Sequence, residues 1–231
     1  MEGPTDQRRL RSNTGDLAVS PKALLGSLRS AVADVRSSMY GTWLRLFFGR
    51  VGRHCHVEYP IYYHDAHRIT MGDECVIRHH VRFNGRSERS ESIKLGIGVS
   101  IRDSTYMDAY GGYISLGNYV AIGHRCVIGG HGGLVVGDYT MIGGFTYIIP
   151  SDHVFDDASL PYQLQGERRR GISIGRNVWI GASCLILDGT TIGDDAVVGG
   201  GSVVKGRVPA RTMYAGVPAR EIRRLPHPTF A

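Results

Sequence analysis

The sequence lacks the features that would place it in a membrane or in an oxidising compartment. No run of 18 apolar residues occurs in the 231-residue chain, so a membrane-spanning helix is not expected. The N-terminus carries no apolar core of the signal-peptide kind, which predicts a cytoplasmic protein. Cysteine is scarce. The four cysteines are scattered and include no CxxC pair, so neither a disulfide framework nor a thiolate metal site is expected.

Acidic residues are fewer than basic ones, and glycine is abundant. The net charge of +6 and the pI of about 9.3 favour anionic partners. No nucleic-acid recognition motif accompanies this charge, so nucleic acid is not an expected partner. The 32 glycines are about twice the usual share and are spread along the chain, which indicates recurrent turns.

An internal repeat of six residues predicts the fold. A period of six is neither helical nor a simple alternation, and it fits short strands joined by tight corners. The repeat falls into seven triplets of apolar residues: Val51, Val57, Tyr63; Met71, Ile77, Phe83; Leu95, Ile101, Met107; Leu116, Ile122, Ile128; Val136, Ile142, Ile148; Ile174, Ile180, Ile186; and Ile192, Val198, Val204.

The breaks in the repeat predict its geometry. Extra residues always follow the third member of a triplet, so three hexads form one coil and insertions leave from a single corner. The predicted object is a triangular prism of about seven coils whose core is the stack of inward hexad residues. A glycine follows the first member of every triplet, and we expect positive φ angles at these glycines.

Both ends of such a prism need covering. We expect residues 1–20 to be a disordered tail and residues 21–50 to form an N-terminal cap, with a helix over 21–39. The β-helix is expected over 51–210, with a long loop at 149–171. Residues 211–231 form a C-terminal segment in which Pro218 begins a short helix through Arg224.

Residues 51–224 resemble the left-handed parallel β-helix acyltransferases with hexapeptide repeats. The resemblance is strongest to the sugar O-acetyltransferases, such as the galactoside and maltose enzymes and those that modify surface polysaccharides. It is carried by "SDHVFDD", "IGRNVWIGASCLI", "TIGDDAVVGGGSVV" and "VPARTMYAGVPAREIR". It implies an all-β, left-handed fold, a homotrimer, and transfer of an acetyl group from acetyl-CoA to a hydroxyl of a sugar or glycan precursor, without a metal.

His153 is the candidate catalytic residue. It lies in the longest insertion, and long loops in compact domains are usually functional or disordered. An alcohol is a poor nucleophile, so attack on a thioester at neutral pH needs a base such as imidazole. The family resemblance places the base at this position. The alternative is a surface loop histidine, and Asp152 and Ser151 could orient its ring.

The resemblance also implies residues for the oxyanion and for CoA. It places a backbone N–H donor near Gly181 and Ala182, and it makes the outward Trp179 a wall of the active-site tunnel or a subunit contact. The CoA candidates are Gly200, Lys205, Arg207 and Arg223. Where the family usually has the stretch "VTKD", this sequence has "VVKGRV", so either Lys205 or Arg207 could contact phosphate.

The acceptor side departs from the galactoside pattern. His131 lies in the insertion just before that of His153, which predicts that the two share an edge about one coil apart. His124 and Asp108 are weaker acceptor candidates. The four cysteines all fall two residues before a hexad residue, so we expect them to be inward and inert.

Residues 39–53 are unusually apolar with arginines nearby, which suggests either packing over the open end of the prism or contact with a membrane surface. Two alternatives to the transferase exist on this fold. One is a non-catalytic scaffold subunit. The other is a γ-type carbonic anhydrase, whose paired histidines five residues apart are missing from this sequence.

Overall fold

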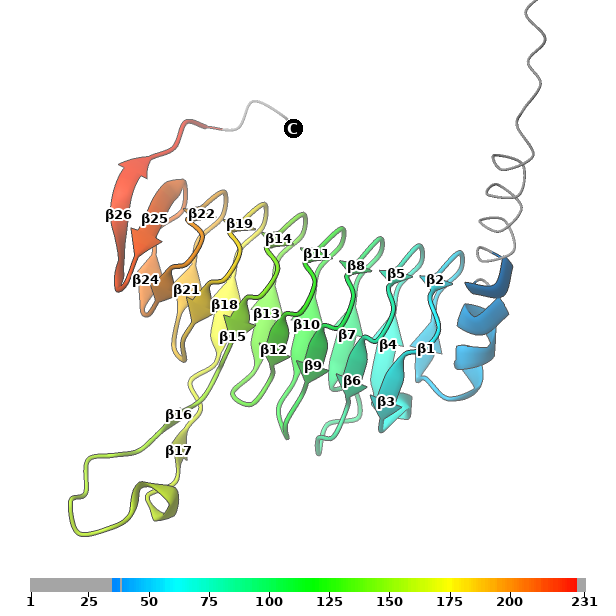
Figure 1. Cartoon of the computed structure of the whole chain (residues 1–231), viewed down its shortest axis with the longest axis horizontal. Coiled ribbons are helices and arrows are strands. Elements are labelled where there is room, and N and C mark those ends of the chain that lie inside the picture. The colour runs from blue at the N-terminus through cyan, green and yellow to red at the C-terminus, as the bar shows by residue number, and fades with distance from the viewer. Residues whose placement is uncertain (1–34, 38, 228–231) are drawn as a thin grey trace, which may run out of the picture.

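The computed structural model describes residues 35–37 and 39–227, which form a solenoid of parallel strands (Figure 1). Three parallel sheets make its sides, which we call faces A, B and C. Face A contains β1 (Arg50–Val51), β4 (Ile69–Met71), β7 (Ile93–Leu95), β10 (Ile114–Leu116), β13 (Leu134–Val136), β18 (Ile172–Ile174), β21 (Thr191–Ile192) and β24 (Arg207–Val208).

Faces B and C follow in each coil. Face B contains β2 (His56–Val57), β5 (Val76–Ile77), β8 (Ser100–Ile101), β11 (Ala121–Ile122), β14 (Met141–Ile142), β19 (Trp179–Ile180), β22 (Val197–Val198), β25 (Thr212–Gly216) and β26 (Ala219–Arg224). Face C contains β3 (Tyr62–His64), β6 (Arg82–Asn84), β9 (Tyr106–Asp108), β12 (Val127–Gly129), β15 (Tyr147–Ile148), β20 (Leu185–Ile186) and β23 (Val203–Val204).

The predicted hexad core is confirmed. Each hexad residue pairs with the hexad residue one coil away, as in the register of Ile122 with Ile101 and Ile142. Of the twenty-one hexad residues, only Tyr63 is partly exposed, and the others are buried. The four cysteines are also buried and form no disulfide, and burial raises the pKa of Cys126 and Cys184.

The expectation of positive φ at the corner glycines is wrong, and close backbone approach explains these glycines instead. Gly96 has no positive φ, but a Cβ built on it would lie 2.5 Å from the carbonyl oxygen of Gly117 in the next coil. The positive φ angles fall two residues later at this corner, at Tyr119 and Tyr139 among others. The column of glycines therefore lets successive coils stack, while larger residues take up the strained conformation.

Insertions leave the solenoid between faces C and A, as the sequence predicted. We call this corner the insertion edge, and its loops are residues 65–68, 85–92, 109–113, 130–133 and 149–171. The last loop forms an arm in which β16 (Asp152–His153) pairs antiparallel with β17 (Glu167–Arg168). Figure 1 shows this arm projecting well beyond the other loops. Single 3-10 turns, η2 (Ala66–Arg68) and η3 (Tyr162–Leu164), lie in the first and last loops.

The C-terminal end differs from the prediction. A shortened corner, with Val208 only four residues after Val204, begins an incomplete eighth coil from β24 and β25. The predicted helix after Pro218 is wrong, because Ala219–Arg224 form β26, which pairs antiparallel with β25. This strand covers the last edge of face B, which would otherwise expose unpaired backbone groups.

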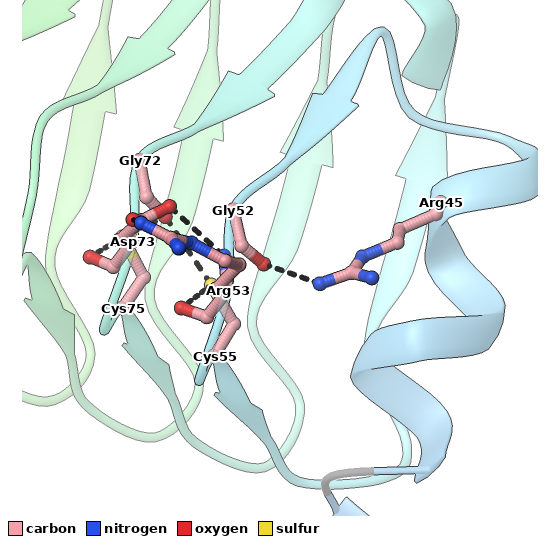
Figure 2. Close-up of polar contacts among 7 residues, drawn as sticks. All are labelled: Arg45, Gly52, Arg53, Cys55, Gly72, Asp73 and Cys75. Carbon is pink, nitrogen blue, oxygen red and sulfur yellow. Dashed lines mark hydrogen bonds and ion pairs between the residues drawn. The ribbon is translucent and has the colours of Figure 1, made fainter.

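The N-terminal end is covered by helical residues 35–37 and 39–43 followed by η1 (Leu44–Leu46). Leu44 and Phe48 are buried against the first coil, so this segment packs over the open end of the prism. Arg45 donates a 3.0 Å hydrogen bond to the carbonyl of Gly52, and Arg53 pairs with Asp73 of the next coil (Figure 2). The predicted tail, 1–20, and the first part of the predicted helix lie outside the described residues.

Candidate active site

The insertion edge holds a cavity of about 450 Å³ beside the arm. Face C supplies its floor, and the loops that follow β9, β12 and β15 supply its walls. The polar residues lining it are Tyr106, Asp108, Tyr110, His131, Ser151, Asp152, His153, Glu167 and Asp188. The structure thus brings together His153, His131 and Asp108, which the sequence places in three successive insertions.

His153 lies on β16, where its backbone is opposite Glu167 of β17. Its side chain is exposed and makes no hydrogen bond or ion pair with any described residue. Ser151 and Asp152 do not orient it, since each has another partner. The ring is therefore free to contact a ligand in the cavity.

His131 is held more tightly than His153. Its Nδ1 lies 3.1 Å from the Oγ of Ser151, and its ring packs on Tyr110 with the ring centroids 3.7 Å apart. Its Nε2 is buried, has no hydrogen-bond partner among the described residues, and lies 3.9 Å from a carboxylate oxygen of Glu167. Burial lowers the pKa of His131, so the neutral ring is favoured.

Asp108 is buried at the end of β9, and each of its two carboxylate oxygens accepts a hydrogen bond. The hydroxyl of Tyr106 donates to one of its oxygens at 2.5 Å, and the backbone N–H of Tyr110 donates to the other at 2.9 Å. Burial, together with the hydrogen bond to Asp108, raises the pKa of Tyr106. These contacts fix the polar part of the cavity that Tyr106, Asp108 and Tyr110 line.

Asp188 anchors the base of the arm. Its carboxylate accepts hydrogen bonds from the backbone N–H groups of Arg170 and Gly171 and from the Arg170 guanidinium. On the arm itself, Asp152 pairs at 3.5 Å with Lys205, which follows β23. The side chain of Lys205 therefore reaches β16.

The other predicted site residues lie elsewhere on the solenoid. Gly181, Ala182 and Gly200 belong to the corner between faces B and C, which we call the second edge. His124 lies on the same edge, packed edge-on against Phe145 with ring centroids 4.8 Å apart, and not in the cavity. Trp179 is 54% exposed on face B, Arg207 is exposed on face A, and Arg223 is on β26. Within one chain, these residues do not meet His153.

Four polar residues of the cavity, Tyr106, Tyr110, Glu167 and Asp188, were missed by the sequence reasoning. Tyr106 immediately precedes the hexad residue Met107, and that position points outward on face C. The signal was available, because an outward aromatic just before an insertion lies at the insertion edge. Tyr110 and Glu167 lie within loops, where the repeat gives no information about direction.

In the part of the chain that the structure describes, no group of three or more His, Cys, Asp or Glu side chains is arranged to hold a metal ion. Over the same residues, no helix is long and apolar enough to cross a membrane.

Comparison with known proteins identifies several relatives. Residues 171–206 match the family "Bacterial transferase hexapeptide (six repeats)". Nodulation protein L of Rhizobium leguminosarum is 43% identical over 154 residues, which cover 65% of this chain and 75% of that protein. Galactoside O-acetyltransferase of Escherichia coli is 35% identical over 119 residues, covering 49% of this chain and 58% of that protein.

A probable acetyltransferase of Mycobacterium tuberculosis is 33% identical over 131 residues, covering 57% of this chain and 44% of that protein. The chain thus spans only about half the length of these last two relatives. Among solved structures, a mutant of the N-acyltransferase AntD from Bacillus cereus, in complex with dTDP-4-amino-4,6-dideoxyglucose and coenzyme A, has a TM-score of 0.60 at 20% identity. The match covers 80% of this chain and 88% of that chain. The family match and this likeness identify the solenoid as a left-handed parallel β-helix.

Proposed function

The chain belongs to the bacterial hexapeptide-repeat transferase family, and from this premise we propose that it transfers an acetyl group from acetyl-CoA to a hydroxyl of a sugar or glycan precursor. The observation that carries the proposal is the cavity on the insertion edge, which is lined by the exposed imidazole of His153 and by the imidazole of His131 that Ser151 and Tyr110 hold in place. The relative named galactoside O-acetyltransferase supports a sugar hydroxyl as the acceptor.

His153 acts as the general base in this proposal. The acceptor oxygen attacks the carbonyl carbon of the thioester while His153 takes the hydroxyl proton. The tetrahedral intermediate then collapses, the C–S bond breaks, and the proton passes from His153 to the departing thiolate. An exposed histidine with no partner among residues 35–37 and 39–227 suits this role, since both its ring nitrogens remain available.

His131 and Asp108 position the acceptor. The buried Nε2 of His131 has no partner among the described residues, and such an atom is costly unless a ligand satisfies it. A sugar hydroxyl in the cavity would supply the missing hydrogen bond. The contacts of Asp108 with Tyr106 and Tyr110 hold the opposite wall in place.

A second subunit completes the site. His153 lies on the insertion edge, whereas the predicted oxyanion donor near Ala182 lies on the second edge, so one chain cannot supply both. A homotrimer in which the insertion edge of one subunit faces the second edge of its neighbour would bring them together. Trp179, exposed beside the second edge, would then line the acetyl-CoA tunnel, and Gly200 and Arg223 lie on the same side of the prism.

The first test is thiol release from acetyl-CoA with a panel of sugars and nucleotide sugars. Native protein is compared with His153→Ala and with His67→Ala, a matched exposed histidine in η2 outside the cavity. We expect acceptor-dependent release that falls by about 10²- to 10⁴-fold in His153→Ala and is unchanged in His67→Ala. Release that survives in His153→Ala would contradict the assignment of the base.

A protein that binds neither acetyl-CoA nor acceptor in calorimetry would instead be a scaffold. This outcome separates the transferase from its non-catalytic alternative. Activity that depends on added zinc, with hydration of carbon dioxide, would point to the carbonic anhydrase alternative.

A further inference from the structure

The insertion edge is hollowed well beyond the cavity that contains His153. Three further cavities, of about 670, 260 and 350 Å³, follow it toward the N-terminal end of the solenoid. Neighbouring cavities share lining residues: Tyr110 lines the first and second, Asn84 the second, third and fourth, and Tyr106 the first and third. The four cavities therefore form one surface depression, which we call the edge groove.

The edge groove is longer than one sugar ring. Arg86 lies in the loop after the second coil, and His153 lies in the loop after the fifth. At a spacing of roughly 4.8 Å per coil, three coils separate them by about 14 Å along the solenoid axis. A ligand that reacts at His153 and fills the groove must therefore contain more than one unit.

The lining of the groove suits a carbohydrate. Tyr110 and Tyr62 are 58% and 49% exposed, although the ring of His131 packs on Tyr110 and the guanidinium of Arg82 lies 5.4 Å from the ring centre of Tyr62. Exposed aromatic faces with polar groups between them match the alternating apolar and hydroxyl surfaces of sugars. Asn84, Asp65 and Glu88 supply amide and carboxylate groups for the hydroxyls.

Arg86 gives the groove a guanidinium that has no ion-pair partner among the described residues. It lines the second and fourth cavities, and its guanidinium forms no ion pair or hydrogen bond with a described residue. The carboxylates of Asp65 and Glu88 line the same cavities without pairing with it. An unpaired guanidinium in a concave surface matches a carboxylate or phosphate, which it can bind through two parallel hydrogen bonds.

We propose that the edge groove binds an acidic oligosaccharide of two or more sugar units, with one end at His153 and an acid group at Arg86. The identity of the reacting end rests on the proposed function, whereas binding along the groove does not. The acid group would be the carboxylate of a uronic acid or a phosphate, which share the same recognition chemistry.

A glycan array tests the proposal with the full chain. The array carries neutral, uronate-bearing and phosphate-bearing glycans of one to six units. It is probed with native protein, Arg86→Gln and the control Arg50→Gln, an exposed arginine on face A. We expect retention of acidic glycans of two or more units, weakened about tenfold in Arg86→Gln and unchanged in Arg50→Gln. Retention on the uronate-bearing glycans identifies the acid group as a carboxylate, and retention on the phosphate-bearing glycans identifies it as a phosphate.

Three outcomes would overturn the proposal: no retention of acidic glycans, equal retention of neutral or single units, or no effect of Arg86→Gln. Thermal unfolding of each variant confirms that it is folded. His153→Ala, applied to the same array and to the thiol-release assay, separates the two proposals. If the array retains the protein through Arg86 but no acetyl transfer occurs, only the proposed function is refuted. If transfer to an acidic oligosaccharide depends on His153 but not on Arg86, only the proposal of binding along the edge groove is refuted.

Discussion

Ser151 and His131, which follow neighbouring coils of the solenoid, are joined by a 3.1 Å contact between the serine Oγ and the histidine Nδ1. This contact occupies one ring nitrogen and leaves the buried Nε2 toward Glu167 and the cavity. A serine at the base of the arm thus fixes a histidine in the preceding loop. The relationship links the position of the arm to the position of the proposed acceptor contact.

Removing this contact should weaken acceptor binding without affecting acetyl-CoA. We expect Ser151→Ala to raise the acceptor KM several-fold, because one hydrogen bond contributes about 1 kcal/mol to holding the ring. Steady-state kinetics with each substrate varied in turn measure the effect. Ser173→Ala, an exposed serine on face A, is the matched control. An unchanged acceptor KM in Ser151→Ala would show that Ser151 does not position His131 for binding.

The partly buried imidazole of His131 should make stability depend on pH. Its folded-state pKa is lowered from the usual 6.5, chiefly by burial, although Glu167 opposes this effect. The unfolded chain therefore binds the proton more readily. The stabilisation is fully present above pH 6.5 and is lost as the pH falls through the folded-state pKa. Urea unfolding at several pH values should show this loss for native protein and a smaller one for His131→Gln.

Other groups with lowered pKa values define what the pH experiment can distinguish. The carboxylates of Asp73 and Asp157, whose pKa values are lowered mainly by hydrogen bonds, lose their contributions only at more acidic pH, below the usual value of 3.8. A loss of stability that begins as the pH falls below 6.5 is thus separable from theirs. An identical pH dependence in native protein and His131→Gln would contradict the prediction.

The column of stacked glycines should be intolerant of side chains. We expect Gly96→Ala to lower the free energy of unfolding by about 3 kcal/mol, since the new Cβ would collide with the backbone of Gly117. Gly206→Ala is the comparison. That glycine has a φ of +86° and open space around it, so only backbone strain of about 1 kcal/mol is expected. Denaturant unfolding of both variants measures the two losses of unfolding free energy. A larger loss in Gly206→Ala than in Gly96→Ala would contradict the explanation.

The proposed assembly predicts a mass in solution of three times the 25.3 kDa of the chain. Trp179 and Met141 are paired neighbours on face B, both about half exposed, and a subunit contact would bury them. We expect Trp179→Glu to reduce the mass measured by light scattering, because a carboxylate would be buried there. Val135→Glu, on face A, should leave it unchanged. A native protein that is monomeric at assay concentration would refute the shared site.

Membrane contact through residues 39–53 remains a prediction after the structure. Leu44 and Phe48 face the first coil, but Trp43, Leu46 and Phe47 stay exposed near Arg50. We expect co-sedimentation with vesicles of anionic lipid that weakens at high salt and in Leu46→Glu. Ile222→Glu, at the opposite end of the solenoid, is the control. No co-sedimentation of the intact protein would end the membrane hypothesis.

The sequence predicted the fold well where the repeat is regular. Hexad residues such as Ile122 are inward because the backbone period fixes their direction, and no other information is needed. The eighth coil was missed because Val208 follows Val204 by four residues, so that the shortened corner breaks the period of six. The helix after Pro218 was wrong because the pairing of β26 with β25 outweighs a local helix signal.

The candidate site was predictable only in part. The spacing of insertions placed His131 and His153 on one edge, since both loops leave from the same corner. It could not show that Ser151 contacts His131 rather than His153, because the conformation of the arm depends on pairing between Asp152 and Arg168, which no repeat specifies. The separation of Ala182 from His153 follows from the triangular cross-section and could have been inferred from the hexad count.

The confinement of every long insertion to one edge has an evolutionary consequence. Closing a longer loop costs little extra free energy, so these loops can lengthen or shorten while the stacked coils remain unchanged. The residues of these loops, which include the proposed acceptor contacts, are therefore less constrained by the stacking of the coils than the glycine column and the hexads are. The scaffold thus separates what must be inherited intact from what is free to vary, which lets one ancestral solenoid give rise to enzymes with different acceptors.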